Sequence, residues 1–355
     1  MKILMPVKVR ESGEFLCPFV YGGIEKFAKT LYDCIPGIIP IEITKKDRES
    51  RRTKSIIHRA VMEHNPDFAI TNDIDNTCTV YLQNLGVPMI SIIHEPKVRD
   101  IRYLDLGKRI NKILDNNGHV YFVSQAQYEF HSDMCERING FPIKEITGYI
   151  NPAYCDDSSP VELEKLYDSV TIGRTDTSKN PFLLHQKMAG SDLTSLVLTS
   201  DSDAHSKEQQ NYADKHSEWQ EPQFTIRNLV HSDVMAQMKK SRVFVSTFPR
   251  ESWGITALEA LASGLPIILL SDGSKHSSQD IAADPSHVVV LPKSISKSDL
   301  WEAVRELSSI SDVRRCEIAM KTRAKHSKTR YLTALDEMIQ YRLLRTKVNS
   351  LDGFI

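Results

Sequence analysis

The chain has 355 residues, more than the roughly 250–300 residues at which a single hydrophobic core stops growing, so two domains are expected. Hydrophobic residues make up 41% and charged residues 26% of the chain, which excludes a fibrous or low-complexity protein. The 45 Lys and Arg residues nearly balance the 46 Asp and Glu residues, and the formal net charge is -1. A uniformly basic nucleic-acid binder is therefore excluded, and any effect of charge must be local.

Neither a targeting segment nor a cysteine framework is visible. The opening MKILMPVKV reaches charged residues too soon for the apolar core of a signal peptide, and no later stretch reaches ~18 uncharged apolar residues. The six cysteines form no C-x-x-C pair, and their spacing fits neither a disulfide framework nor a zinc site. We expect a cytoplasmic protein with buried thiols and no metal.

Short apolar, β-branched runs alternate with helix-like stretches along the chain. This pattern is typical of β-α-β units, in which a parallel sheet is covered on both faces. The first series predicts strands at 2–9, 38–43, 68–71, 89–93 and 119–124. The second series predicts strands at 169–173, 194–199, 242–247, 266–270 and 287–291, with a helix at 255–263.

The two series predict an α/β protein with a Rossmann-like domain at 1–150, a second one at 151–325 and a helical tail at 326–355. Residues 150–160 are rich in Pro, Asp and Ser and read as an interdomain linker. The tail has a mostly apolar face that must pack against another part of the protein. That face consists of Leu332, Leu335, Met338, Ile339, Tyr341 and Leu343.

The most informative segment is 243–270, VFVSTFPRESWGITALEALASGLPIILL. Glu251 lies in a loop after a buried strand, Gly254 permits a tight turn, and a helix follows. The backbone N–H groups of Gly254, Ile255 and Thr256 would point into the cleft and hold an anion such as a diphosphate. Taken alone, Glu251 and Glu259 favour a plainer interpretation, an acidic residue at a helix N-terminus and a solvated helix residue.

A second segment, 172–181 (IGRTDTSKNP), places Arg174 and Lys179 at the end of a strand. Fixed cations there can stabilise the negative charge that grows on a departing nucleoside diphosphate, without a metal. The alternative is a pair of surface cations on a polar loop. Because ligands of two-domain α/β proteins bind outside the carboxyl ends of the strands, we expect both segments to border a central cleft.

The first predicted domain contributes two weaker signals. Gly22 and Gly23 follow the opening strand and precede a helix ending near Cys34, so the backbone there can approach a phosphate closely. They do not form the G-x-G-x-x-G fingerprint of dinucleotide-binding proteins. His94 follows the strand at 89–93 and is expected at the cleft, where a structural histidine is as good an interpretation as a catalytic one.

The segment 243–270 resembles the retaining, nucleotide-sugar-dependent GT-B glycosyltransferases of the glycogen synthase and sucrose synthase type, the group 1 glycosyltransferases. Their E-x7-E motif would be Glu251 and Glu259. The segment 172–181 is similar to their G-R…K-N-P loop. The resemblance is strong over 170–292 and loose over 1–150, and it implies a GT-B fold, in which two Rossmann-like domains face a central cleft.

The resemblance also implies a role for each candidate residue. Glu251 would contact the hydroxyls of the donor sugar and Glu259 the ribose of the nucleotide, while His94 would approach the sugar from the opposite wall. The diphosphate would be held by Arg174, Lys179 and the amides of Gly254, Ile255 and Thr256, with Gly22 and Gly23 as the Gly-rich loop. The donor would be a nucleoside-diphosphate sugar, with UDP favoured over GDP, and a hexosyl or pentosyl group would be transferred.

Positive charge gathers in two segments of the first domain. Residues 44–60 carry a net charge of +5 and residues 97–112 a net charge of +4. Both segments follow predicted strands at their carboxyl ends, so we expect them to border the acceptor side of the cleft. This arrangement suggests a polyanionic acceptor.

Two polyanions compete for this place. Duplex DNA would bind through its phosphates and present a base to the donor sugar. In size and plan the chain is similar to the phage glycosyltransferases that modify hydroxymethylcytosine in DNA, and such an enzyme would act in the host cytoplasm. The second polyanion is an anionic lipid surface, on which residues 99–116 would lie as a basic amphipathic helix of a protein peripheral to a membrane. The plainer interpretation of the same segment is a helix packed on the sheet with its charges in water.

We therefore expect a glycosyltransferase acting on 5-hydroxymethylcytosine in phage DNA. The alternative is transfer to a lipid or a cell-envelope glycan, and the non-enzyme alternative is a nucleotide-sugar sensor using the same cleft. No obligate protein partner is indicated.

Overall fold

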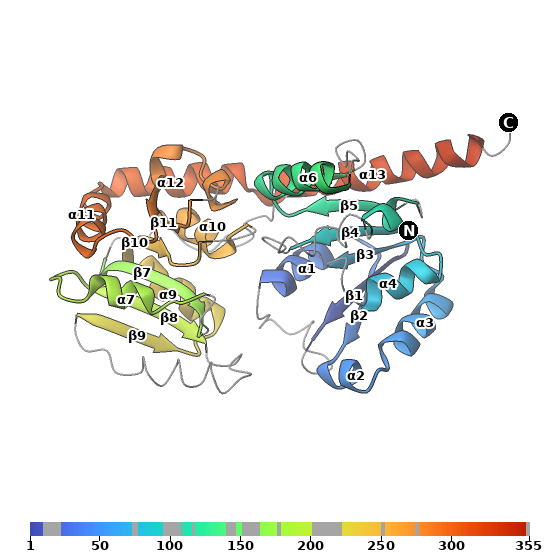
Figure 1. Cartoon of the computed structure of the whole chain (residues 1–355), viewed down its shortest axis with the longest axis horizontal. Helices are drawn as coiled ribbons and strands as arrows, with labels where there is room; N and C mark the ends of the chain where they lie inside the picture. Colours follow the sequence, from blue (N-terminus) through green and yellow to red (C-terminus); the bar gives the residue numbers. More distant parts are fainter. Residues whose placement is uncertain are drawn as a thin grey trace. The chain divides into compact units, whose positions relative to one another are not determined.

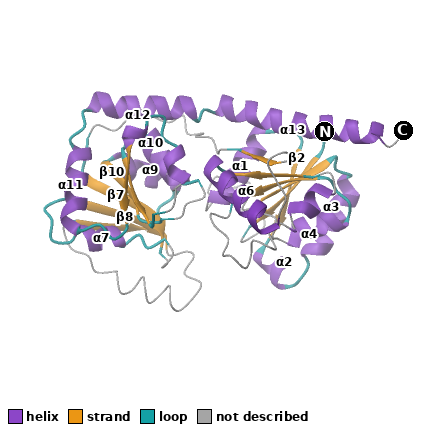
Figure 2. Cartoon of the chain, turned by 45° about the horizontal axis from the view of Figure 1, so that its top comes forward, coloured by secondary structure: helices purple, strands orange, loops and turns teal. Residues whose placement is uncertain are grey.

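The computed structural model describes residues 1–9, 23–72, 77–94, 108, 110–115, 118–139, 147–150, 164–175, 179–200, 222–249, 253–273 and 277–352. The chain divides into two compact units (Figure 1). Unit 1 consists of Met1–Cys155 with Lys328–Ile355, and unit 2 of Asp156–Ser327. Each unit contains one six-stranded parallel sheet flanked by helices (Figure 2). The predicted α/β class with two Rossmann-like sheets is confirmed.

The sheet of unit 1 has the strand order β2-β1-β3-β4-β5-β6. Its order reverses between β1 and β3, which makes the carboxyl ends of these two strands a topological switch point. The strands are β1 (Ile3–Lys8), β2 (Ile38–Ile43), β3 (Phe68–Asn72), β4 (Met89–Ile93), β5 (His119–Phe122) and β6 (Thr147–Tyr149). The helices include α1 (Gly23–Cys34), α2 (Lys45–Glu49), α3 (Thr53–His64), α4 (Thr77–Asn84), α6 (Gln125–Asn139) and α13 (Lys328–Asp352).

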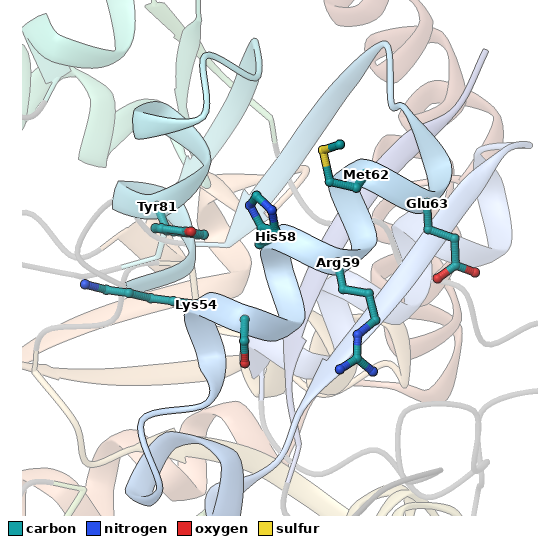
Figure 3. A pocket seen from close by; sticks show the side chains of 7 residues that line it. Lys54, His58, Arg59, Met62, Glu63 and Tyr81 are labelled. Atoms are coloured by element: carbon teal, nitrogen blue, oxygen red, sulfur yellow. The ribbon is translucent and has the colours of Figure 1, made fainter.

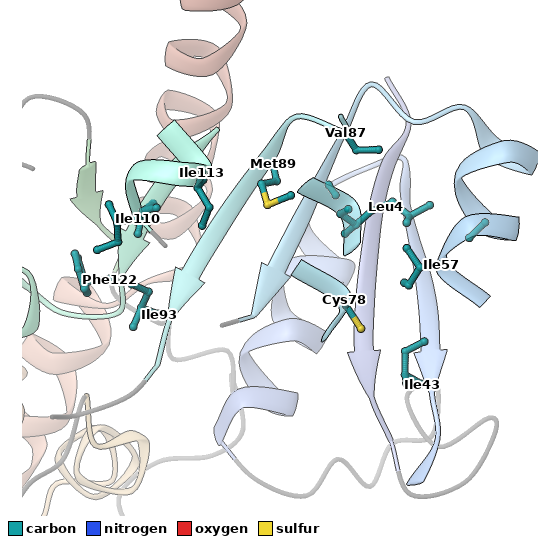
Figure 4. Close-up of a cluster of buried hydrophobic side chains, with 14 residues drawn as sticks. Leu4, Ile43, Ile57, Cys78, Val87, Met89, Ile93, Ile110, Ile113 and Phe122 are labelled. Carbon is teal, nitrogen blue, oxygen red and sulfur yellow. The ribbon is translucent and has the colours of Figure 1, made fainter. Parts of the chain in front are cut away.

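Every residue of β3 and β4, the two central strands of unit 1, is buried. The core of this unit therefore covers both faces of these strands. Figure 4 shows side chains of one apolar cluster, in which Ile110 and Ile113 join Met89 and Phe122. Residues 110–115 are helical, and Ile110 and Ile113 have no more than 1% of their surface exposed. The interpretation of a helix packed on the sheet is confirmed for this part of the 99–116 segment; residues 99–107 lie outside the described ranges.

The sheet of unit 2 has the order β12-β11-β10-β7-β8-β9, which reverses between β7 and β10. The strands are β7 (Tyr167–Arg174), β8 (Ser195–Ser200), β9 (Gln223–Arg227), β10 (Ser241–Ser246), β11 (Ile267–Ser271) and β12 (Val288–Pro292). The helices include α7 (Leu183–Met188), α9 (His231–Lys239), α10 (Ile255–Ala262), α11 (Lys297–Ser308) and α12 (Asp312–Lys325), with short 3₁₀ turns at η1 (Ser277–Asp280) and η2 (Pro285–His287).

All ten predicted strands are present, with ends within two residues of the expected ones. Two further strands, β6 and β9, were not predicted. Both lie at the edge of a sheet; β6 has three residues, and four of the five residues of β9 are only partly buried. Short edge strands lack the continuous apolar run that marks a central strand.

The linker prediction falls on residues 150–160, of which the structure describes only residue 150.

The predicted helical tail is α13, which belongs to unit 1. Tyr331, Leu335, Met338 and Ile339 are buried, and their spacing of four, three and one residues places them on one helix face. The ring centroid of Tyr331 lies 6.2 Å from that of Phe27 on α1. Leu332, expected on the apolar face, is 36% exposed instead.

None of the helices among the described residues combines the length and apolar character needed to cross a membrane.

Candidate functional site

The carboxyl ends of β7 and β10 are neighbours in unit 2, because these strands pair at the switch point of the sheet. The hydroxyl of Thr247, directly after β10, donates a hydrogen bond of 3.1 Å to the carbonyl oxygen of Lys179. On the other side of β7, the hydroxyls of Thr175 and Thr199 are hydrogen-bonded at 2.6 Å. These bonds hold the loop after β7 against the sheet edge where α/β proteins bind ligands.

The two predicted diphosphate-binding cations have different surroundings. Arg174, the last residue of β7, is exposed. Lys179 is partly buried, and its Nζ lies 3.8 Å from the ring centroid of Phe248, which is a cation–π contact. Lys179 is therefore held more firmly than a loose surface cation, because its main chain and its ammonium group both contact residues that follow β10, and its role at a diphosphate stays a prediction. Residues 176–178 lie outside the described ranges.

Helix α10 starts from a turn that only glycine fits. Gly254 is the N-cap residue and has φ 88°, in the left-handed region. A Cβ atom at this position would lie 2.2 Å from Oγ of Ser278. The Ser278 hydroxyl in turn donates to the carbonyl oxygen of Trp253 at 3.2 Å. The turn is therefore packed tightly against η1.

The start of α10 is suited to an anion. The first intrahelical bond runs from the N–H of Leu258 to the carbonyl of Gly254 at 3.0 Å. The N–H groups of Gly254, Ile255 and Thr256 precede it and have no acceptor within the helix, and the helix dipole favours negative charge at this end. Glu251 lies outside the described residues, so its role as a contact for the sugar stays a prediction.

Glu259 is buried, with 5% of its surface exposed. The solvated helix residue of the plainer interpretation is therefore wrong. Every residue from Ala257 to Ala262 is buried, so this part of α10 has no solvent-exposed face. Nε2 of His231, at the start of α9, lies 3.4 Å from Oε1 of Glu259. His231 was not singled out from the sequence, where nothing around it distinguishes it from other polar residues.

In unit 1, His94 follows β4 at the carboxyl edge of the sheet. Its Nε2 lies 3.2 Å from Oδ1 of Asn72, the last residue of β3. The Phe27 ring packs edge-on against the imidazole with 5.0 Å between centroids. Burial lowers the pKa of His94 to about 3, so the ring is neutral near pH 7. Gly23 is the first described residue of α1, whereas Gly22 lies outside the described ranges.

The structure thus gathers six of the predicted site residues at the carboxyl edge of the sheet of unit 2: Arg174, Lys179, Gly254, Ile255, Thr256 and Glu259. His94 occupies the corresponding edge in unit 1. No group of three or more His, Cys, Asp or Glu side chains among the described residues is arranged to hold a metal ion.

The architecture is that of the GT-B glycosyltransferases. The chain is similar to sucrose-phosphate synthase from Thermosynechococcus elongatus, at 12% identity, a TM-score of 0.70 and coverage of 98% of this chain and 100% of the other. A glycosyltransferase from Rickettsia africae is similar at 15% identity and a TM-score of 0.68, with coverage of 96% and 98%. HepE of Anabaena, in complex with UDP and glucose, is similar at 13% identity and a TM-score of 0.65, with coverage of 96% and 100%.

Residues 157–319 match the family of glycosyl transferases group 1. This range covers most of unit 2 and includes every site residue described there. No curated protein sequence matches the chain. The match to glycosyl transferases group 1 over 157–319 and the GT-B fold together indicate a glycosyltransferase.

The tight turn before α10 predicts that Gly254→Ala is more harmful than an ordinary glycine substitution. A left-handed residue with a side chain costs about 1–2 kcal/mol, and the contact with Ser278 should add about 1–3 kcal/mol. Urea denaturation should therefore show a larger loss of unfolding free energy than for Gly273→Ala. Gly273 is the matched control, because it has φ 93° but an added Cβ would meet no atom of the described residues within 4 Å. Equal losses in the two variants would refute the packing argument.

The pKa of His94 predicts how stability depends on pH. Unfolding restores the ordinary value of 6.5, so between about pH 6.5 and pH 3 the unfolded chain binds the proton that the folded chain excludes. Stability should fall with decreasing pH in this window, by up to about 1.4 kcal/mol per pH unit from this group. His94→Gln should show a shallower loss in urea denaturation between pH 7 and pH 4.5. Parallel profiles for the two proteins would contradict the assignment.

Proposed function

We propose that this protein is a retaining glycosyltransferase that moves a hexosyl or pentosyl group from a nucleoside-diphosphate sugar to a hydroxyl group. The observation that carries the proposal is the cluster at the switch point of unit 2. There a cation held in place (Lys179), a helix N-terminus (α10) and a buried carboxylate (Glu259) lie within the group 1 domain. This set can bind the diphosphate by charge and the ribose by hydrogen bonds.

In the proposed reaction the bond between the anomeric carbon and the diphosphate oxygen breaks, and the acceptor oxygen takes its place on the same face. The leaving phosphate oxygen receives the proton of the incoming hydroxyl, so no enzymic nucleophile is required. Arg174 and Lys179 stabilise the charge on the diphosphate as it departs. Glu251 orients the sugar hydroxyls, and the neutral His94 offers a hydrogen bond to the sugar without adding charge.

A UDP-sugar is the proposed donor. The support comes from HepE of Anabaena, a structural neighbour whose structures contain UDP and glucose or UDP-glucose. The cytoplasmic location expected from the sequence stays a prediction.

The proposed acceptor is polyanionic, because the basic segment at 44–60 is solvent-exposed. Its cations Lys45, Lys46, Arg48, Arg51, Arg52, Lys54 and Arg59 are all exposed. The acidic residues of the segment are engaged locally. Asp47 closes a capping box with Thr44, whose hydrogen bond lowers the pKa of that carboxyl, and Glu49 lies 3.9 Å from Lys45. The positive charge is therefore left to attract a partner.

A pocket between α3 and α4 extends this surface. The residues that line it are Lys54, Ser55, His58, Arg59, Met62, Glu63 and Tyr81 (Figure 3). Cations near an aromatic ring occur in sites that bind nucleic acid, where they contact phosphates and the ring stacks on a base. The lipid alternative is weaker, because Ile110 and Ile113, which would face the lipid, are buried in unit 1. DNA is therefore favoured over a lipid surface. We keep 5-hydroxymethylcytosine in phage DNA as the proposed acceptor, because its hydroxymethyl group supplies the alcohol.

Sugar transfer is tested by incubating labelled nucleotide sugars with hydroxymethylcytosine-containing duplex DNA, unmodified DNA and anionic lipid. We expect label on the hydroxymethylated DNA only. Lys179→Ala and Glu251→Ala should each lower the rate by at least about 100-fold, because each removes a charge or hydrogen bond at the reacting group. Their melting temperatures should stay close to that of the wild type.

The matched control for the first variant is Lys321→Ala, which removes an exposed lysine of α12 in the same unit and should leave the rate unchanged. Wild-type rates in Lys179→Ala would refute the site. Label on lipid alone would refute the DNA acceptor but keep the enzyme class. Donor binding by the wild-type protein without turnover on any acceptor or water would favour the sensor.

The basic surface makes a separate prediction for DNA binding. Replacing Arg51, Arg52 and Lys54 with Gln should weaken binding and reduce the slope of log affinity against log salt concentration by up to about 3, because each lost phosphate contact accounts for about 0.9. Fluorescence anisotropy with labelled duplex at several salt concentrations measures this slope.

The control for this measurement is Gln at Lys293, Lys297 and Lys321, three exposed lysines of unit 2. It removes the same net charge at a distance from the basic segment in the sequence. Equal slopes in the two triple variants would argue against a DNA surface at 44–60.

A further inference from the structure

The buried carboxylate of Glu259 has a histidine beside it for which the proposed reaction gives no role. His231 is the first residue of α9, and its Nε2 lies 3.4 Å from Oε1 of Glu259. The Glu259 side chain is only 6% exposed, whereas that of His231 is 47% exposed. One edge of the imidazole therefore meets the buried carboxylate while much of the ring remains accessible to a ligand.

The topology explains why the two residues meet. Helix α9 connects the edge strand β9 with the central strand β10, and α10 follows β10. Because parallel strands all end at the same edge of a sheet, both helices begin at the carboxyl edge of unit 2. The two helices also pack against each other and against β10. The contact is therefore built into the framework that carries the donor residues.

The contact has a physical consequence for the carboxylate. A buried carboxylate is costly unless polar groups compensate it, and its two oxygens can accept several hydrogen bonds. A histidine beside Oε1 restricts the positions open to that oxygen. The separation of 3.4 Å exceeds the roughly 2.8 Å of a strong charge-assisted hydrogen bond. The contact with His231 therefore restricts Glu259 without the short geometry of a strong hydrogen bond.

We propose that His231 is a positioning residue of the nucleoside subsite. It holds Glu259 so that the carboxylate faces the ribose hydroxyls of the donor, and the accessible part of its ring lines the space beside the ribose. This inference rests on the proposed function, in which Glu259 binds the ribose. It assigns His231 to donor binding and not to the chemical step.

The inference is tested by calorimetric titration of the full chain with UDP and with 2′,3′-dideoxy-UDP, which lacks both ribose hydroxyls. We expect His231→Ala to bind UDP about tenfold more weakly, with a much smaller change for the dideoxy compound. In transfer assays KM for the donor should rise by a similar factor, while kcat stays within about twofold. His231→Gln, which keeps a side-chain N–H, should recover most of the affinity.

Two further proteins complete the design. Ser232→Ala alters the neighbouring exposed residue of α9 and should bind UDP as the wild type does. The double variant His231→Ala/Glu259→Gln should bind UDP no more weakly than Glu259→Gln alone, since His231 acts through Glu259.

The outcomes separate the two levels of the argument. If the wild type binds no nucleoside diphosphate, the proposed function fails, and this inference fails with it. If the wild type binds UDP but His231→Ala binds it equally well, or weakens UDP and dideoxy-UDP to the same extent, only the inference is overturned. If His231→Ala does not fold, His231→Leu, which also lacks a side-chain N–H, takes its place, and wild-type affinity for UDP or an equal weakening of UDP and dideoxy-UDP in that variant overturns the role.

Discussion

The candidate site in unit 2 depends on one strand pair, β7 with β10. Their parallel pairing brings the ends of two strands far apart in the sequence to the same edge, and the reversal of strand order there separates the helices that follow. The loop carrying Lys179 is bound to Thr247, and the chain after β10 leads into the Gly254 turn and α10. The cations, the amides and the carboxylate therefore share one support, which the proposed binding of a diphosphate together with a ribose requires.

Much of this arrangement could be predicted from the sequence, because it follows from local patterns. Central strands are continuous apolar runs, and the turn before α10 needs a residue that tolerates positive φ, which Gly254 supplies. The missed edge strands β6 and β9 lack such a run, since pairing on one side alone demands little apolar surface.

The environment of Glu259 could not be predicted, because it depends on tertiary packing. A glutamate within a helical segment is normally solvated, but Ala257–Ala262 is buried on all sides. The partner residue His231 comes 28 positions earlier, on a helix whose position is set by the unpredicted strand β9. Nothing local in the sequence marks the pair. The site was thus predictable where it consists of turns and strand ends, and not where it consists of contacts between helices.

The return of α13 to unit 1 bears on how the protein folds during synthesis. Unit 2 is contiguous in the chain, so it can fold once Ser327 has left the ribosome. Unit 1 must wait, because Tyr331 and Leu335 fill its core, and Tyr331 packs on the same Phe27 ring that packs against His94. The sheet of unit 1 thus remains unfinished until α13 is made, and the edge that carries His94 is completed after unit 2.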